Sequence, residues 1–201
     1  MDAFEAMGTA RAIRYLKPDP VPTELVEKLI WAATRASSPG NSQAWAFVVV
    51  TDAEKKARIG GAVADAVSGF IRDPGPDADR SVRLMLRGAK ALAEGLATAP
   101  VLVLVCGRMT YPSPNNPDEM SVWSACYPAA QNLIVAARAL GLGATFTTFQ
   151  RRAEQVVRGT LGIPDDVKMA ALIPIGYPDR PHGPVNRRPV EEVIHWEGWQ
   201  G

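Results

Sequence analysis

The segment Ser37-Ser38-Pro39-Gly40-Asn41-Ser42-Gln43-Ala44-Trp45 lies between a strong helix pattern and a strong strand pattern. It places hydroxyls and two side-chain amides within a few residues and then ends in an indole. A planar ligand rich in heteroatoms needs such donors and acceptors along its edge and an apolar wall behind it. The same residue types also suit a polar helix C-terminus followed by a turn. The segment alone does not separate a ligand loop from a turn, so the rest of the chain has to decide.

Outward from this segment, the chain combines amphipathic helices with short apolar strands. Apolar residues at four-residue spacing predict a helix that begins at Pro22, and a continuous apolar run predicts a strand over residues 45–51. Thr51 and Glu54 predict a capping box for the next helix. The same patterns predict helices over 2–8, 54–68, 80–98, 121–140 and 153–161, and strands over 101–105, 144–149 and 169–175. Helices outweigh strands and some strands are separated by two helices, which favours one α+β domain over residues 1–201.

Two long loops and an unusual tail complete the chain. Residues 71–79 and 108–120 are rich in proline and polar residues, and we expect these loops to shape substrate choice. In the tail over 179–201, prolines exclude a regular helix near its start. The tail nevertheless carries apolar residues that need burial, either against another subunit or by wrapping around its own chain: Val190, Val193, Ile194, Trp196 and Trp199.

Composition excludes several classes of function. The chain has 201 residues, of which 47% are hydrophobic, and its formal net charge is +1, so no global field attracts nucleic acid or acidic membranes. Its longest apolar runs are far too short to span a membrane, and its acidic N-terminus is unlike a signal peptide. Cys106 and Cys126 form no Cys-x-x-Cys pair. We therefore expect a cytoplasmic protein.

The familiar catalytic motifs are missing, which shifts attention to a bound cofactor. The Gly141-Leu142-Gly143 run follows a helix and precedes a strand, which is the reverse of a dinucleotide-binding fingerprint. The two histidines, His182 and His195, lie in the tail without a ligand spacing, so a histidine-based metal site or a serine–histidine triad is not expected. If the protein is an enzyme, a cofactor carries the chemistry and the chain supplies position and charge.

Three groups of residues suit the three parts of one cofactor. Arg11 and Arg14, together with Arg187 or Arg188 in the tail, suit a terminal phosphate, because guanidinium groups bind phosphate through two hydrogen bonds. The loop from Ser37 to Gln43 suits a polyol and a ring edge, and backbone amides at Gly141–Thr145 can approach a flat ring closely. A phosphate, a polyol and a flat heteroaromatic ring together describe FMN.

With these residues in view, the chain resembles the nitroreductase-like FMN flavoprotein family over almost its whole length. Arg11-Ala12-Ile13-Arg14 resembles the N-terminal Arg-Ser-x-Arg element of that family, and residues 38–45 resemble its Pro-Ser-x-x-Asn-x-Gln-Pro-Trp segment. Further similarities are the long apolar helix with the turn at 141–143, the Leu-Gly-Ile-Pro and Ile-Gly-Tyr-Pro runs, and the basic element before Pro189. Each motif alone is weak, but together, in the same order along one chain, they are specific.

The resemblance implies an α-β-α sandwich with a central, mostly antiparallel sheet. It also implies a homodimer that binds FMN at its interface, in which the segment 179–201 embraces the partner and adds to its sheet. By the family pattern, the cofactor-binding residues would be Arg11, Ala12, Arg14, Ser37, Ser38, Asn41, Gln43, Leu142, Gly143, Thr145 and Arg187 or Arg188. Flavin N5 would carry the chemistry, without a catalytic side chain or a metal.

The activity implied by the resemblance is an FMN-dependent oxidoreductase. NADH or NADPH would reduce the flavin, and a small electron acceptor such as a nitroaromatic or a quinone would then be reduced at the same face, by a ping-pong mechanism. Dehalogenation, breakdown of the flavin itself, and non-catalytic flavin binding or storage remain as alternatives. Ala10 and Ala12 stand where the family often has a basic residue and a serine, so they leave the phosphate contacts open.

Overall fold

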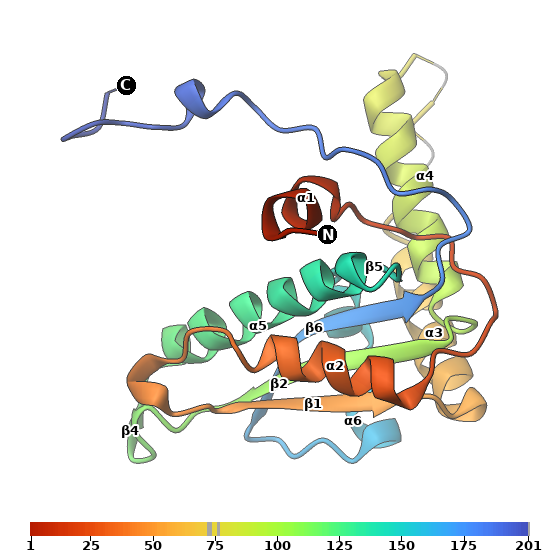
Figure 1. Ribbon diagram of the computed structural model, residues 1–201. Coiled ribbons are helices and arrows are strands. Elements are labelled where there is room, and N and C mark those ends of the chain that lie inside the picture. The colour runs from red at the N-terminus through yellow and green to blue at the C-terminus, as the bar shows by residue number, and fades with distance from the viewer. Residues whose placement is uncertain (72–73, 76, 201) are drawn as a thin grey trace.

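A four-stranded antiparallel sheet forms the centre of the computed structural model, which describes residues 1–71, 74–75 and 77–200 (Figure 1). The strand order is β1-β2-β6-β5, where the bounds are Trp45–Val50 for β1, Val101–Arg108 for β2, Val167–Gly176 for β6 and Gly143–Ala144 for β5. A minor hairpin pairs β3, Pro112–Ser113, with β4, Asn116–Pro117, inside the expected loop over 108–120. The expected mixed fold with a mostly antiparallel sheet is confirmed.

Helices cover both faces of the sheet (Figure 1). On one face lie α2, Thr23–Ala33, and the long α5, Glu119–Ala139, with α1, Ala3–Thr9, packed beyond α5. On the other face lie α3, Ala53–Ser68, α4, Arg80–Gly95, and α6, Glu154–Leu161. Short 3₁₀ turns lie at η1, Pro39–Asn41, at η2, Phe149–Ala153, and at η3, Val190–Glu192.

Strand β2 is buried on both faces and divides the apolar core in two. Val101, Val103 and Val105 face α2 and α5, whereas Leu102 and Leu104 face α3, α4 and α6. All five residues are at most 1% exposed. This two-residue alternation is the period of an extended chain, and it explains why the strand reads as a continuous apolar run. The result is the three-layer α-β-α arrangement that the family resemblance implied.

Two sequence-based predictions at helix ends were wrong. Asp52 caps α3, because its Oδ1 accepts the backbone N–H of Lys55 at 2.8 Å; the expected capping box at Thr51 does not form. Aspartate and threonine are both good N-caps, and the helix register selects the residue nearer to its first turn. Helix α4 ends at Gly95, three residues before the expected end, and Ala99 N–H then bonds to the Gly95 carbonyl.

The expected strand over residues 144–149 was also wrong in extent. The structure has strand geometry only at Gly143–Ala144, followed by one isolated bridge between Thr147 and Leu172, and η2 begins at Phe149. At the end of this short strand, Ile13 N–H bonds to the Ala144 carbonyl at 3.1 Å, and the Thr145 hydroxyl bonds to the Ile13 carbonyl. The threonine-rich sequence has the right propensity, but tertiary contacts override it.

The tail leaves the body of the molecule and carries exposed apolar side chains. In the described part of the chain, the last backbone hydrogen bond between the tail and the body joins Val185 N–H to the Gly8 carbonyl at 3.0 Å, after which the chain runs outward past α1 (Figure 1). Trp196 and Trp199 are 70% and 86% exposed. The expected loop over 71–79 lies partly outside the described residues. No helix in the described part of the chain is long and apolar enough to cross a membrane.

Candidate cofactor site

The segment that follows α1 is held against β5 by two hydrogen bonds on either side of Ile13. Ile13 N–H donates to the Ala144 carbonyl at 3.1 Å, and the Thr145 hydroxyl donates to the Ile13 carbonyl at 2.6 Å. Ile13 is buried, while Arg11, Ala12 and Arg14 are exposed. An extended backbone alternates its side chains, so anchoring Ile13 inward directs its neighbour Arg14 outward, and Arg11 at the start of the segment is exposed as well.

Two glycines let this segment approach its neighbours. A Cβ on Gly143 would lie 2.7 Å from Ile13 Cγ2, so the strand passes the segment at a distance that no larger residue permits. A Cβ on Gly88 of α4 would lie 3.2 Å from the Arg14 guanidinium carbon. A glycine such as Gly88 inside a helix is less favourable for helix formation than alanine. The structure shows that it provides the surface on which Arg14 rests.

Arginines line the pocket that opens beside this segment. The pocket has a volume of about 490 Å³, and Arg11, Arg14, Arg87 and Arg180 all contribute to its wall. Within the residues that the structure describes, none of these four guanidinium groups pairs with a carboxylate. Arg180 instead stacks 4.2 Å from the ring of Tyr15. Four cations without an anionic partner repel one another, and a bound anion relieves that repulsion.

A second group of polar residues forms the loop around η1. Ser38 Oγ accepts the backbone N–H of Gln43 at 2.8 Å and lies 3.3 Å from Ser42 Oγ, so the first serine closes the loop on itself. Gly40, Asn41 and Gln43 all have φ near +50°, with values of 56°, 51° and 47°. Two left-handed residues other than glycine within three positions store backbone strain, and such strain concentrates at ligand sites.

The side-chain amides of this loop are available for a ligand. Asn41 and Gln43 are exposed, and in the described structure neither side chain makes a hydrogen bond. Tyr111 packs on the loop, since a Cβ on Gly40 would collide with its ring. Trp45, the last residue of the segment, is half-buried against the core beneath α2 and α5, as expected for a core residue. The loop therefore combines fixed backbone geometry with unused donors and acceptors.

The two groups of polar residues lie at opposite ends of the folded subunit. The arginine pocket is at the β5 end of the sheet, whereas the η1 loop lies where β1 begins, and α2 runs between them (Figure 1). The eleven residues of α2 alone span about 16 Å. The structure thus brings Arg11 and Arg14 together with Gly143 and Thr145, and it brings Ser37, Ser38, Asn41 and Gln43 together elsewhere. One copy of the chain does not bring the two sets into contact.

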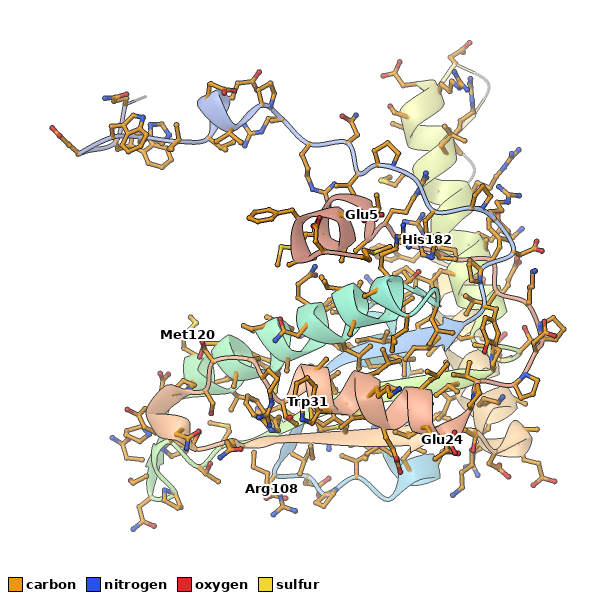
Figure 2. All side chains as sticks on the ribbon, viewed as in Figure 1. Glu5, Glu24, Trp31, Arg108, Met120 and His182 are labelled. Carbon is orange, nitrogen blue, oxygen red and sulfur yellow. The ribbon has the colours of Figure 1, made fainter. Side chains whose placement is uncertain are left out.

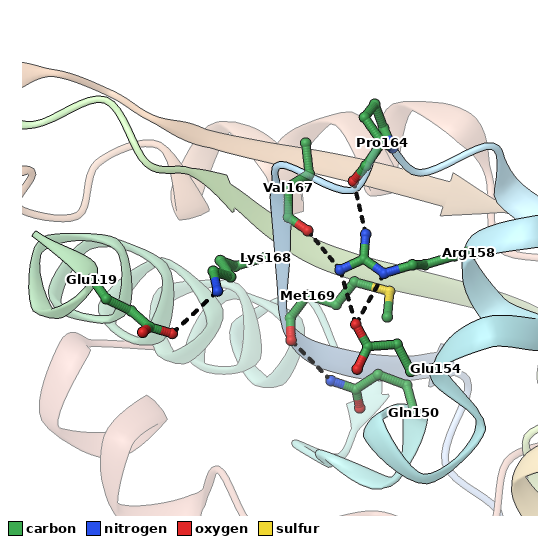
Figure 3. Close-up of polar contacts among 8 residues, drawn as sticks. All are labelled: Glu119, Gln150, Glu154, Arg158, Pro164, Val167, Lys168 and Met169. Atoms are coloured by element: carbon green, nitrogen blue, oxygen red, sulfur yellow. Dashed lines mark hydrogen bonds and ion pairs between the residues drawn. The ribbon is translucent and has the colours of Figure 1, made fainter. Parts of the chain in front are cut away.

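Other charged residues are paired internally, in contrast to the pocket arginines (Figure 3). Arg158 donates to Glu154 at 2.9 Å and to the carbonyls of Pro164 and Val167 at 2.7 and 2.9 Å, and so fixes the turn into β6. Lys168 lies 3.5 Å from Glu119. Each of these charged groups already has a partner within the chain. We therefore assign this group to stability and the arginines of the pocket to ligand binding.

The two thiols are poor candidates for catalysis. Burial raises the pKa of Cys106 to about 11 and that of Cys126 to about 12. Cys126 also donates to the Cys106 carbonyl at 3.4 Å. A thiol rather than a thiolate persists at neutral pH, and a thiol is a weak nucleophile. Among the described residues there is also no cluster of side chains that would hold a metal ion.

Comparison with known proteins agrees with this geometry. A model of the Nitroreductase family matches residues 8–177. The chain belongs to the nitroreductase family. It is 27% identical over 202 residues to "Putative NADH dehydrogenase/NAD(P)H nitroreductase" of Archaeoglobus fulgidus, covering 98% of this chain and 99% of that protein.

The chain is also similar to deiodinases. It is 29% identical over 184 residues to iodotyrosine deiodinase 1 of Rattus norvegicus, a match that covers 88% of this chain but 62% of the rat protein. The fold matches that of an oxidised iodotyrosine deiodinase bound to FMN and 3-iodo-L-tyrosine, with a TM-score of 0.77, 21% identity, and coverage of 98% of this chain and 100% of the other. That likeness establishes a nitroreductase fold for the present chain.

Several positions near the pocket of this nitroreductase-family chain were not singled out from the sequence. Arg87 comes from α4 and Arg180 from the start of the tail, and both read in sequence as ordinary surface cations. Arg187 and Arg188, which were expected to bind phosphate, are exposed on the tail beyond Val185, and Arg187 bonds to the carbonyl of Asn186. The backbone N–H of Leu142, which was expected to contact the cofactor, donates to the Ala137 carbonyl and so closes the C-terminus of α5.

Proposed function

We propose that this nitroreductase-family protein binds FMN between two copies of the chain. As an NADH- or NADPH-dependent oxidoreductase, it would then reduce small electrophiles such as nitroaromatics and quinones. The observation that carries the proposal is that the two groups of polar residues lie at opposite ends of one folded subunit. A twofold axis that places the η1 loop of one copy over the arginine pocket of the other would complete two equal sites.

The residues present fit FMN in charge and in hydrogen-bonding capacity. The pocket offers Arg11 and Arg14 without anionic partners, which suits a phosphate dianion. The η1 loop offers the free amides of Asn41 and Gln43, which suit a polyol or the edge of a ring. The iodotyrosine deiodinase of the same fold binds FMN, which supports the same cofactor for this chain.

The tail supports the dimer. Its exposed apolar residues, which include Trp196 and Trp199, lie on a segment that extends away from its own body (Figure 1). Large exposed aromatic side chains are costly in water and are enriched in protein interfaces. We infer that residues 179–201 pack against the partner and that the domain over residues 1–201 is stable as a homodimer.

Bound FMN would supply the hydride-transfer chemistry between a reduced nicotinamide and the second substrate. The chain positions both ligands and supplies charge. Arg14 and Arg87 place fixed positive charge in the pocket, which favours electron density on an adjacent ring. Cys106 and Cys126 take no part, because their protonated thiols are buried. These free cysteines also suit a reducing compartment, so we place the protein in the cytoplasm.

Reductive dehalogenation is the second candidate for the same site. It is favoured by the similarity to the rat iodotyrosine deiodinase, which extends over 88% of this chain. Because the chain spans less than two thirds of that protein, the similarity does not extend to the whole deiodinase. The two candidates share the cofactor and differ in the second substrate.

The absorbance spectrum of the purified protein tests the proposal first. We expect bound FMN, or uptake of added FMN with a stoichiometry of one per chain, in a particle with the mass of two chains. Anaerobic addition of NADH or NADPH should bleach the flavin band, and a quinone or a nitroaromatic should restore it. If a halotyrosine restores the band and these acceptors do not, the result favours dehalogenation. Protein that binds no FMN refutes both candidates.

A further inference from the structure

A second pocket opens where the start of α5, the η2 turn, α6 and the start of β6 meet. Its volume is about 400 Å³, within the range of small-molecule sites. Its wall combines three cations, three carboxylates, an indole and a thioether: Arg151, Arg158, Lys168, Glu119, Glu154, Asp165, Trp123 and Met169. None of these described residues lines the arginine pocket at the β5 end of the sheet, so the proposed cofactor site does not account for this one.

Four of the six charged groups in the wall are already paired with one another. Lys168 lies 3.5 Å from Glu119, and Arg158 lies 2.9 Å from Glu154. Figure 3 shows these two ion pairs on either side of Met169. Each pair has no net charge, so the pairs frame the pocket without attracting a charged ligand strongly.

The remaining cation and carboxylate are Arg151 and Asp165. Across the residues that the structure describes, neither side chain makes a hydrogen bond, an ion pair or a ring contact. Their sequence neighbours differ, because the guanidinium carbon of Arg152 lies 3.7 Å from the centroid of an aromatic ring. Asp166 pairs with Arg108 at 3.9 Å, and Arg108 lies at the edge of the molecule below β1 (Figure 2). The pocket therefore holds one free positive and one free negative group.

The wall also offers a flat apolar surface. Trp123 is half-buried and stacks on Tyr127, with 5.7 Å between the ring centroids and 16° between the ring planes. Tyr127 in turn meets Phe146 edge to face, with the ring centroids 5.8 Å apart. Met169 adds a buried thioether, a group that packs well against aromatic rings. An indole supported in this way favours an aromatic group in the ligand.

We propose that this pocket binds an aromatic zwitterion of the α-amino-acid class. The carboxylate of the ligand pairs with Arg151, its ammonium group pairs with Asp165, and its ring packs on Trp123. Such a ligand neutralises both free charges at once, whereas a simple anion or a simple cation leaves one of them unpaired. The inference goes beyond the proposed function, since it requires neither FMN nor a nicotinamide.

Isothermal titration calorimetry of the purified protein with four ligands tests each part of the site. L-phenylalanine carries all three groups, whereas phenethylamine lacks the carboxylate, phenylpropanoate lacks the ammonium group, and L-alanine lacks the ring. We expect L-phenylalanine to bind with one site per chain. Each of the other three ligands should bind at least about tenfold more weakly, the effect of one lost contact with a charged group or of one lost apolar ring.

Two variants connect each charged group of the ligand to its residue. In Arg151→Gln, the preference for L-phenylalanine over phenethylamine should fall from about tenfold to about twofold, because the carboxylate then has no partner to lose. In Asp165→Asn, the preference for L-phenylalanine over phenylpropanoate should fall in the same way. Both side chains are exposed, so the fold should be retained.

Arg152→Gln and Asp166→Asn are the matched controls. They remove the same charges from neighbouring positions that do not line this pocket, and they should leave both preferences unchanged. An equal loss of preference in these controls would show a general effect of charge and would overturn the site. Preferences that persist in Arg151→Gln and Asp165→Asn, or an absence of binding at millimolar L-phenylalanine, would overturn it as well.

The failure of this proposal and the failure of the proposed function are distinguishable. Protein that binds no FMN but binds L-phenylalanine with these preferences refutes the cofactor and retains the pocket. Protein that binds FMN but shows no such preferences retains the cofactor and refutes the pocket as an amino-acid site. L-alanine that binds as tightly as L-phenylalanine would remove the contact between the ring and Trp123, and with it the aromatic class of the ligand.

Discussion

Replacement of Gly143 by alanine should disturb the cofactor site through a single methyl group. The new Cβ would lie 2.7 Å from Ile13 Cγ2, 3.0 Å from Ile13 Cβ and 3.1 Å from Leu16 Cδ2. Ordinary contact begins near 3.4 Å, so the Ile13 methyl must retreat by 3.4 − 2.7 = 0.7 Å or the strand must shift by a similar amount. Ile13 is held by hydrogen bonds to Ala144 and Thr145, so its backbone cannot move without straining them.

Overpacking of this kind costs about 1–3 kcal/mol. For a chain of this length each kcal/mol lowers the midpoint of thermal unfolding by about 2–4 °C, so we expect a fall of roughly 2–12 °C. Arg11 and Arg14 flank Ile13, and displacement of the segment should also weaken FMN binding about 10- to 100-fold, the equivalent of one lost hydrogen bond to a charged group. Differential scanning calorimetry and quenching of flavin fluorescence measure the two effects.

Gly61→Ala is the matched control, because a Cβ on Gly61 of α3 meets nothing within 4 Å. Alanine is the better helix former by about 1 kcal/mol, so this variant should be slightly more stable than the wild type and should bind FMN equally well. If Gly143→Ala melts at the wild-type temperature and binds FMN as tightly, the close approach of β5 to the segment does not hold the site, and the reasoning fails.

Three other predictions concern separate parts of the molecule. Asn41→Gly should weaken FMN binding about tenfold, the loss expected for about one hydrogen bond. It should leave the unfolding midpoint within about 2 °C, because the amide makes no bond in the free chain and glycine accepts the left-handed φ of 51°. An unchanged affinity would remove the η1 loop from the site. Replacement of Trp196 and Trp199 by serine should shift the dimer towards monomers in sedimentation velocity at low concentration, and a dimer of unchanged stability would contradict the role of the tail. Burial raises the pKa of Cys106 to about 11 and that of Cys126 to about 12. A thiol reagent should therefore react slowly with the native protein at pH 8 and rapidly after unfolding. Fast modification of the native protein would show that the thiols are accessible.

Periodic apolar patterns predicted most of the fold. The alternate burial of Val103 and Leu104 in β2, and the four-residue repeat of Val26 and Ile30 in α2, reflect geometry that each element has on its own. The limits of elements were less predictable where neighbours compete for them. The edge strand ends at Ala144, whose carbonyl accepts the N–H of Ile13, a residue 131 positions away in the chain.

The candidate site was predictable in part, for a similar reason. The clustering of Ser38, Asn41 and Gln43 is local, so the sequence displays it directly. The pocket is assembled from distant segments, and neither Arg87 in α4 nor Arg180 in the tail has a local signal that distinguishes it from a solvated cation. His182 was set aside in sequence because it has no nearby ligand spacing, yet the fold places it among cations from two other elements.

The distance along α2 between the two groups of polar residues has a consequence for dimers that combine two different variants. If each cofactor is held by the pocket of one copy and the η1 loop of the other, Arg11→Ala and Asn41→Gly damage opposite halves of a site. A mixed dimer of the two variants would carry both defects in one site and none in the other. Two variants with weakened cofactor binding would then regain about a quarter of the wild-type sites after statistical exchange of subunits, a complementation that a site built within one chain does not allow.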